Sequence, residues 1–310
     1  MNPALSVIFF TVTAGAGYGL LFLLAITRVA QLSDSISPDQ LTFMGFAGLV
    51  LVTIGLISST FHLAKPKNAW RSFIRFRTSW LSREAVFAVL FYPVCLLWLG
   101  FEWWTGNTKI TALFAVVTAL LCLVVLFCTA MIYASLKTIR QWHTALTPVN
   151  FLLLGLMLGS LILALMFVQQ QLSIQRVLTV SVVLVVVAAL VKCVYFYWIE
   201  KPAGPTINSA LGFLKASVQL LDVGHSSDTF HTKEFGFQTT RIKLLWLRIA
   251  CLLLAFLIPF CLVSGVLGGV GLISLLLATI SAYVGVFVER WLFFAEARHV
   301  VNLYHGMQRT

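Results

Sequence analysis

Basic and aromatic side chains gather in one stretch of the chain, residues 62–84, between two long apolar runs. The stretch reads HLAKPKNAWRSFIRFRTSWLSRE and carries six lysines and arginines against one carboxylate, that of Glu84. His62 and Glu84 are side chains that can take up and release protons. Because quinone reduction moves protons as well as electrons, these residue types fit quinone chemistry. The stretch is called the basic segment below.

Two roles are predicted for the side chains of the basic segment. Trp70 and Trp80 could stack on a quinone ring, although tryptophan is also common at membrane interfaces. Glu84 could relay protons, or it could form an ion pair with a nearby arginine. The candidates for quinone binding or proton relay are His62, Trp70, Arg71, Arg75, Trp80, Ser82 and Glu84. The residues predicted to dock a partner subunit are Lys65, Lys67, Arg77 and Arg83.

A second polar group lies near the C-terminus, in the stretch VERWLFFAEARHVVNLYHG. Charges at membrane depth are costly unless they are paired or face a cavity. Glu289 and Arg290 are adjacent on a helix and point apart, so we expect each to find its partner elsewhere, and Glu84 is a candidate for Arg290. Arg290 and His299 complete the set of candidate quinone or proton-relay residues.

The composition indicates a membrane protein. Hydrophobic residues make up 60% of the chain and charged residues 10%, whereas soluble domains have about 45–50% and about 25%. A membrane-spanning helix needs about 20 apolar residues. Eight runs qualify, at roughly residues 5–30, 41–63, 84–104, 109–135, 147–169, 177–198, 244–263 and from 267 past 288. We therefore predict an all-α bundle of eight transmembrane helices, one domain over residues 1–310.

The loops predict the topology. With eight spans, the N- and C-termini share one side of the membrane, called side A, and the opposite side is called side B. Side B holds Arg28, Lys109 and Arg176, whereas the basic segment and most other lysines and arginines lie on side A. The positive-inside rule then makes side A cytoplasmic, in a bacterial inner membrane. The longest loop, residues 199–243, is also on side A, and a short amphipathic helix is expected around residues 210–221.

Several kinds of site are absent from the sequence. It has no phosphate-binding loop, no G-x-G-x-x-G motif and no serine elbow. The cysteines lie in apolar runs without C-x-x-C spacing, so we expect no iron–sulfur cluster in this chain. All histidines fall on side A, so two haems on opposite sides of the membrane could not both be ligated by histidine. We expect no haem in this chain. The alternative is a single haem held by His62 and His299.

Short motifs resemble those of the membrane anchor subunits of the dimethyl sulfoxide reductase family. They are HLAKP at 62–66, AWR at 69–71, TSWLSRE at 78–84, TP at 147–148 and ERWLFFAE at 289–296. The number and spacing of the helices match over essentially the whole sequence. The family often has Gly where Ala64 stands, and the loop 199–243 is longer than in its shorter members.

This resemblance implies a complex of three subunits. A catalytic subunit would carry a molybdenum bis-molybdopterin-guanine-dinucleotide cofactor, and a ferredoxin-like subunit would carry four [4Fe–4S] clusters. The anchor would hold both on the membrane and bind menaquinone or ubiquinone near the last cluster, without haem. The family's quinone-site histidine falls on His62, and its acidic residue falls on Glu84.

The resemblance leaves the substrate open. The SWLSRE and ERWLFFAEARH stretches are closest to family members that oxidise sulfite and whose catalytic subunits are cytoplasmic. We therefore favour electron transfer from sulfite to quinone. An anchor of a dimethyl sulfoxide or other anaerobic reductase that oxidises quinol is the alternative, and a multi-helix transporter is a second one.

Overall fold

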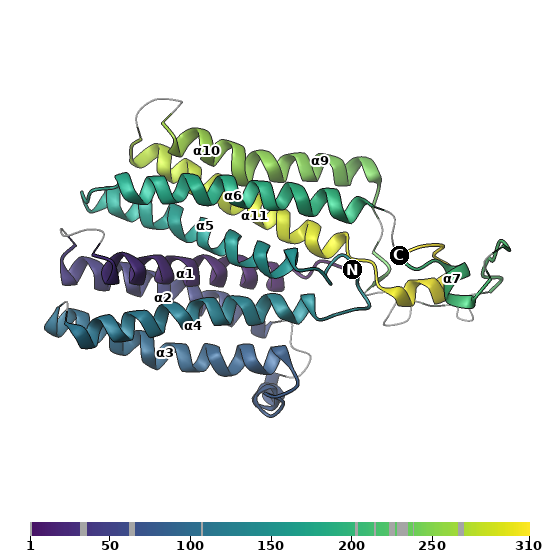
Figure 1. Ribbon diagram of the computed structural model, residues 1–310, viewed down its shortest axis with the longest axis horizontal. Helices are drawn as coiled ribbons and strands as arrows, with labels where there is room; N and C mark the ends of the chain where they lie inside the picture. The colour runs from purple at the N-terminus through teal and green to yellow at the C-terminus, as the bar shows by residue number, and fades with distance from the viewer. Residues whose placement is uncertain are drawn as a thin grey trace.

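The computed structural model describes residues 2–31, 36–61, 66–106, 108–201, 204–213, 215–222, 227, 235–237, 239–265 and 270–310. Within these residues, eight helical segments are long and apolar enough to cross a membrane, and they lie side by side along the long axis of the molecule (Figure 1). The segments are α1 (Leu5–Val29), α2 (Pro38–Thr60), α3 (Trp80–Thr105), α4 (Lys109–Ala134), α5 (Leu146–Gln169), α6 (Gln175–Glu200), the seventh span (Arg241–Val263) and α11 (Leu272–Ala295). The predicted all-α membrane bundle is confirmed, and its helix ends agree with the predicted runs to within a few residues.

The first helix is the centre of the bundle. α1 packs against α2, α4, α5 and α11, and most of its middle is buried. Gly15 and Gly19 of α1 face Gly155 and Gly159 of α5, and a Cβ at Gly19 or Gly159 would clash with the backbone of the other helix. Small residues four apart let two helices approach closely where the bilayer gives no hydrophobic driving force.

The seventh span is not a regular α-helix. It consists of α9 (Arg241–Leu252), a π-helical turn η2 (Leu253–Leu257) and α10 (Ile258–Val263). Pro259 has no N–H to donate, and its ring would clash with the carbonyl one turn earlier, so the helix widens there. Gly285 of α11 packs directly on the backbone of Ala255 in the wide turn. This contact holds α11 beside the seventh span.

A small cap covers the end of the bundle at which both termini lie (Figure 1). It contains α7 (Ile207–Leu211), η3 (Val300–His305) and the C-terminal residues. The Ile207 N–H donates to the Gln308 carbonyl at 3.1 Å, and the Val300 N–H donates to the Thr138 carbonyl at 3.1 Å. This end is side A.

The prediction of an amphipathic helix around residues 210–221 is wrong. α7 ends at Leu211, and residues 215–222 are not helical. Gly212 follows α7 in the left-handed conformation, with φ of 78°, which ends a helix.

Candidate functional site

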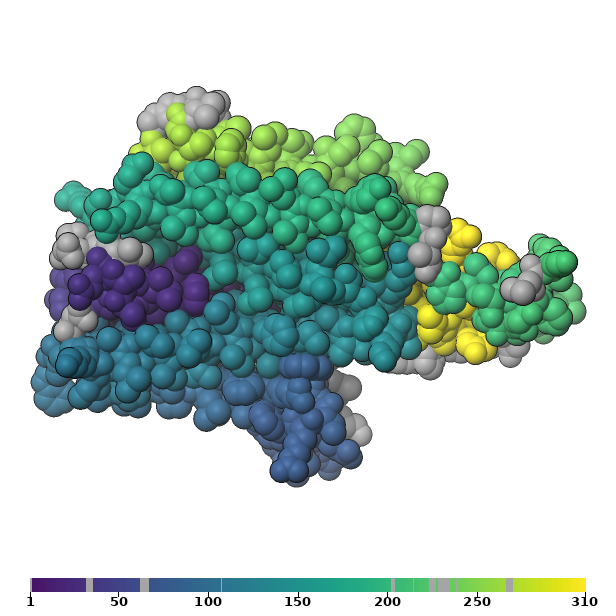
Figure 2. Space-filling view, viewed as in Figure 1, coloured from purple at the N-terminus to yellow at the C-terminus, as the bar shows by residue number. Residues whose placement is uncertain are grey.

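The basic segment projects sideways from the side-A end of the bundle, between α2 and α3 (Figure 2). His62 and Lys65 lie outside the described residues. From Pro66 to Phe73 the segment forms a 3₁₀ helix, η1. Trp70 is exposed, and the Arg71 guanidinium lies 5.8 Å from the centre of its ring. Lys67, Arg75 and Arg77 are also exposed, so this surface is open to solvent or to a partner.

The segment returns to the bundle through the first turn of α3. The Ser79 hydroxyl accepts from the Ser82 N–H at 3.5 Å and caps the helix. Arg83 donates to the carbonyls of Phe76 and Arg77 at 3.1 and 2.9 Å. Its guanidinium also lies 4.2 Å from the centre of the Trp80 ring. Arg83 therefore fixes the preceding loop against α3 and does not pair with Glu84.

Glu84 is buried just inside the side-A end of the bundle. Its residue is 6% exposed, and it lies about 6 Å along the helix axis from the start of α3. The Thr129 hydroxyl of α4 lies within hydrogen-bond distance of Glu84 Oε1 and, at 3.0 Å, of the Val125 carbonyl, and its one hydrogen is shared between the two acceptors. Among the described residues no cation forms an ion pair with Glu84. A buried carboxylate with a neutral partner can change its protonation more readily than one locked in an ion pair.

A second buried group joins α6 and α11. Lys192, Glu289 and Arg290 are 1%, 0% and 3% exposed. Lys192 Nζ donates to Glu289 Oε1, and Arg290 Nε donates to Glu289 Oε2. We call these three residues the buried triad. The expectation that Glu289 and Arg290 point apart is therefore wrong, because the long arginine side chain folds back onto the neighbouring carboxylate. The expected pairing of Arg290 with Glu84 is not formed.

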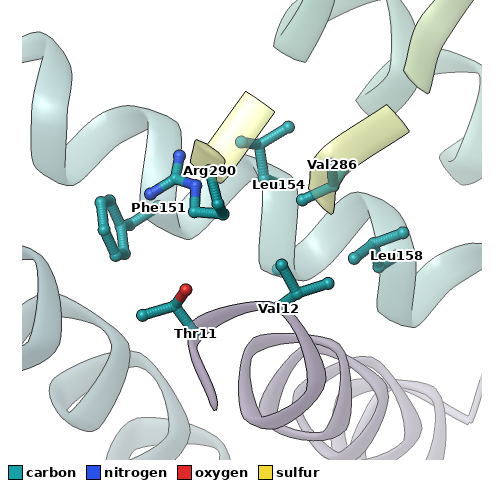
Figure 3. Close-up of a pocket in the computed structure, with 8 residues that line it drawn as sticks. Thr11, Val12, Phe151, Leu154, Leu158, Val286 and Arg290 are labelled. Carbon is teal, nitrogen blue, oxygen red and sulfur yellow. The ribbon is translucent and has the colours of Figure 1, made fainter. Parts of the chain in front are cut away.

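The rest of the Arg290 guanidinium faces aromatic rings and a small cavity. Its Cζ lies 3.9 Å from the centre of the Phe151 ring and 5.0 Å from that of Phe293. Nη1 and Nη2 have no hydrogen-bond partner among the described residues. The cavity has a volume of ≈ 10 Å³, and Figure 3 shows Thr11 across it from Arg290. That volume has room for about one water molecule.

A third ionic group lies nearer the side-A surface, and its arginine covers the same Phe196 ring as Lys192 of the buried triad. Arg248 of α9 donates to Glu200 at the end of α6 and, at 2.9 and 2.7 Å, to Glu296 just beyond α11. The Glu200 side chain is 62% exposed, whereas that of Glu296 is 8% exposed. Burial raises the pKa of the Glu296 carboxyl, and the nearby Arg248 partly offsets this. We call these three residues the entrance group.

The candidates predicted from the sequence therefore lie in separate places. Trp80 and Ser82 lie in the first turn of α3 and Glu84 begins the second, whereas Trp70, Arg71 and Arg75 lie on or beside η1. His299 instead belongs to the cap, where its ring lies 4.6 Å from that of Phe235 and its Nδ1 accepts from the Val301 N–H. Thr129, Lys192 and the entrance group were not among the candidates. Lys192 stood out in the sequence as a cation within an apolar run, but its partner depends on how α6 and α11 pack.

Comparison with known proteins identifies the family. The family of DMSO reductase anchor subunits (DmsC) matches residues 1–295. The chain belongs to this family. The C subunit of the sulfite dehydrogenase of Allochromatium vinosum is 34% identical over 326 residues, which cover 98% of this chain and 99% of that protein. The C subunit of the anaerobic dimethyl sulfoxide reductase of Escherichia coli K12 is 31% identical over 125 residues, which cover 37% of this chain and 42% of that protein.

Family membership confirms the resemblance seen in the sequence motifs. The chain is a multi-pass membrane anchor subunit of a DMSO reductase-type complex. An anchor subunit implies a catalytic subunit and an iron–sulfur subunit as its partners.

Proposed function

We propose that this anchor subunit passes electrons between an iron–sulfur partner subunit and quinone, in a complex that oxidises sulfite to sulfate. The observation that carries the choice of sulfite is the match to the sulfite dehydrogenase anchor over nearly the full length of both proteins. The match to the dimethyl sulfoxide reductase anchor extends over less than half of either protein. A reductase that oxidises quinol is therefore the second candidate.

The side-A end of α3 has the residue types that a quinone headgroup needs. A bound quinone takes up two electrons and two protons. Glu84 supplies a buried carboxylate that Thr129 orients, and Trp80, about one turn nearer the side-A end of α3, supplies an aromatic surface. Leu81 is exposed on the same turn, so the site lies next to a surface that contacts lipid, from which a quinone would enter. His62 and Ser82 are included in the proposed site from the sequence motif.

The basic segment is proposed to dock the iron–sulfur subunit. Its exposed Lys67, Arg71, Arg75 and Arg77 form a cationic surface beside the proposed quinone site. A negatively charged partner would be attracted and oriented there. The partners proposed for this anchor are a ferredoxin-like subunit with four [4Fe–4S] clusters and a catalytic subunit with the molybdenum cofactor, both on the cytoplasmic side.

The test is to isolate the intact complex from its native membrane in mild detergent. Molybdenum and iron should co-purify with this anchor, and sulfite should reduce a quinone analogue. If the complex were active with dimethyl sulfoxide and quinol but not with sulfite, the anchor function would stand and the proposed substrate would be wrong. Isolation of the anchor without molybdenum or iron, under conditions that keep other respiratory complexes intact, would contradict the proposal.

A further inference from the structure

Proton supply to a buried site must pass through the protein. Two electrons from the iron–sulfur subunit and two protons from water on side A convert each quinone to quinol. Glu84 is almost fully buried, so it needs a route by which it is protonated again. The structure holds a row of polar groups that leads from the side-A surface toward Glu84.

The row begins at the entrance group. Glu200 is exposed, and Arg248 links it to Glu296, which is buried. Glu296 Oε2 has no hydrogen-bond partner among the described residues, although it is shielded from solvent. Lys192 Nζ and the Arg248 guanidinium lie 4.8 and 5.1 Å from the centre of the same ring, that of Phe196. An unpartnered buried carboxylate oxygen beside a cation is a place where an ordered water fits.

The row continues through the buried triad. Lys192 and Arg290 both contact Glu289 directly, and the three residues lie about 8–12 Å inside the helix ends. The triad has a net positive charge, and two nitrogens of Arg290 have no partner in the described part of the protein. Such groups can hold and orient water without changing their own charge.

Tyr133 of α4 connects the triad to Glu84. Its ring packs on Phe151 and Phe293, the same two rings that Arg290 covers. Tyr133 follows Thr129 by four residues on α4, so its side chain lies on the same helix face as the hydroxyl that donates to Glu84.

We propose that these groups form a proton path from the side-A surface to Glu84. Glu200 and Arg248 form its entrance, and Glu296 takes up the proton and releases it to water. The buried triad orients the water that follows, and the Tyr133 hydroxyl passes the proton on to Glu84. The path rests on the proposed function, because quinone reduction is what consumes the protons.

The test compares Glu296→Gln with Glu102→Gln in the purified complex. Both residues are buried carboxylates paired with an arginine, but Glu102 pairs with Arg28 on side B. E296Q should lower sulfite-to-quinone turnover by about tenfold or more, because a relay group contributes at least that much. It should also raise the solvent deuterium isotope effect and leave sulfite-to-dye turnover unchanged. E102Q should match the wild-type complex in all three measurements.

A spectroscopic readout separates a proton carrier from a structural residue. Redox-induced infrared difference spectra should contain a protonated-carboxyl band that E296Q removes and E102Q keeps. Tyr133→Phe keeps the ring packing and should also slow quinone turnover. Tyr283→Phe is its control and should not slow turnover, because the Tyr283 hydroxyl bonds to Thr13 and is not part of the path. The molybdenum and iron bound per anchor report whether each variant complex assembles. If E296Q does not assemble, the comparison of Y133F with Y283F tests the path.

The outcomes distinguish the path from the proposed function. If the wild-type complex reduces quinone, and E296Q and Y133F behave like their controls, the path is wrong and the function stands. If the wild-type complex reduces no quinone, the proposed function fails and the path fails with it.

Discussion

Two buried carboxylates at opposite ends of the bundle differ in the partner that each receives. Glu102, on side B, accepts hydrogen bonds from two nitrogens of Arg28, one of them at 3.1 Å. Glu84, on side A, accepts a hydrogen bond from the neutral hydroxyl of Thr129. A bidentate arginine holds a carboxylate in its charged form, whereas a hydroxyl leaves both protonation states open. At the scale of single residues, Glu84 is therefore better suited to proton chemistry than Glu102.

Glu84→Gln tests this distinction directly. The amide keeps the size of the side chain and accepts the hydrogen bond from Thr129, but it cannot carry a proton. Quinone-linked turnover should fall by about a hundredfold to ten-thousandfold, as for loss of a general acid or base. Turnover with an artificial dye should be unchanged, because that reaction bypasses the anchor.

Thr129→Val should give a smaller loss of quinone turnover, since it removes only the orienting hydroxyl. Thr53→Val is its control, because Thr53 also donates to a backbone carbonyl and contacts a polar side chain, Tyr92, away from Glu84. Equal turnover in T129V and T53V would count against an orienting role for Thr129.

The buried triad makes Glu289 the residue whose loss should cost the most stability. Glu289→Ala leaves Lys192 and Arg290 buried without their shared carboxylate. Removing one partner of a buried ion pair costs about 3–5 kcal/mol, whereas an exposed partner contributes about 0–1 kcal/mol. E289A should therefore lower the unfolding temperature of the detergent-solubilised protein far more than E200A does. Similar unfolding temperatures for the two variants would show that the triad does not stabilise the bundle.

At the scale of helices, the sequence was informative about spans and much less so about contacts. Run length and hydropathy locate the eight helices, because any membrane-spanning helix must satisfy its backbone internally and present apolar side chains. The contact of Lys192 with Glu289 could not be predicted, because it depends on the packing of α6 against the seventh span and α11. The widened turn before Pro259 was likewise not predicted from the apolar pattern. Helix content inside the loop 199–243 was predicted wrongly, because a single glycine in the left-handed conformation ends α7.

The contact between α1 and α5 depends on glycine. Gly19→Val would place a side chain against the backbone at Gly155 and push the two helices apart. Because α1 is the central helix, we expect loss of the folded protein, measured as loss of the monodisperse peak in detergent. Gly100→Val is the control, since a Cβ at Gly100 of α3 has no neighbour within 4 Å. If G19V eluted like G100V, the close α1–α5 packing would not be needed for folding.

At the scale of the whole molecule, the two ends of the bundle differ in charge and in shape. The basic segment projects sideways at side A, and the cap extends beyond the helix ends there (Figures 1 and 2). The turns on side B are short, and exposed Lys109 lies there. An uneven distribution of this kind provides one face for a soluble partner, and it places that face beside the proposed quinone site.

Reversal of charge on the basic segment should release the partner subunits from the membrane. Arg75→Glu combined with Arg77→Glu replaces two exposed cations with anions, so an acidic docking face would be repelled. Molybdenum and iron should then move from the membrane fraction to the soluble fraction. In the wild type, the same release should require high salt, since the Debye length shortens from about 10 Å at 0.1 M to about 3 Å at 1 M. Lys109→Glu combined with Arg176→Glu makes the same change in net charge on side B and should retain both metals. If the Arg75 and Arg77 double variant retained all of the metals, the partner would dock elsewhere on side A, and the cap is the next candidate surface.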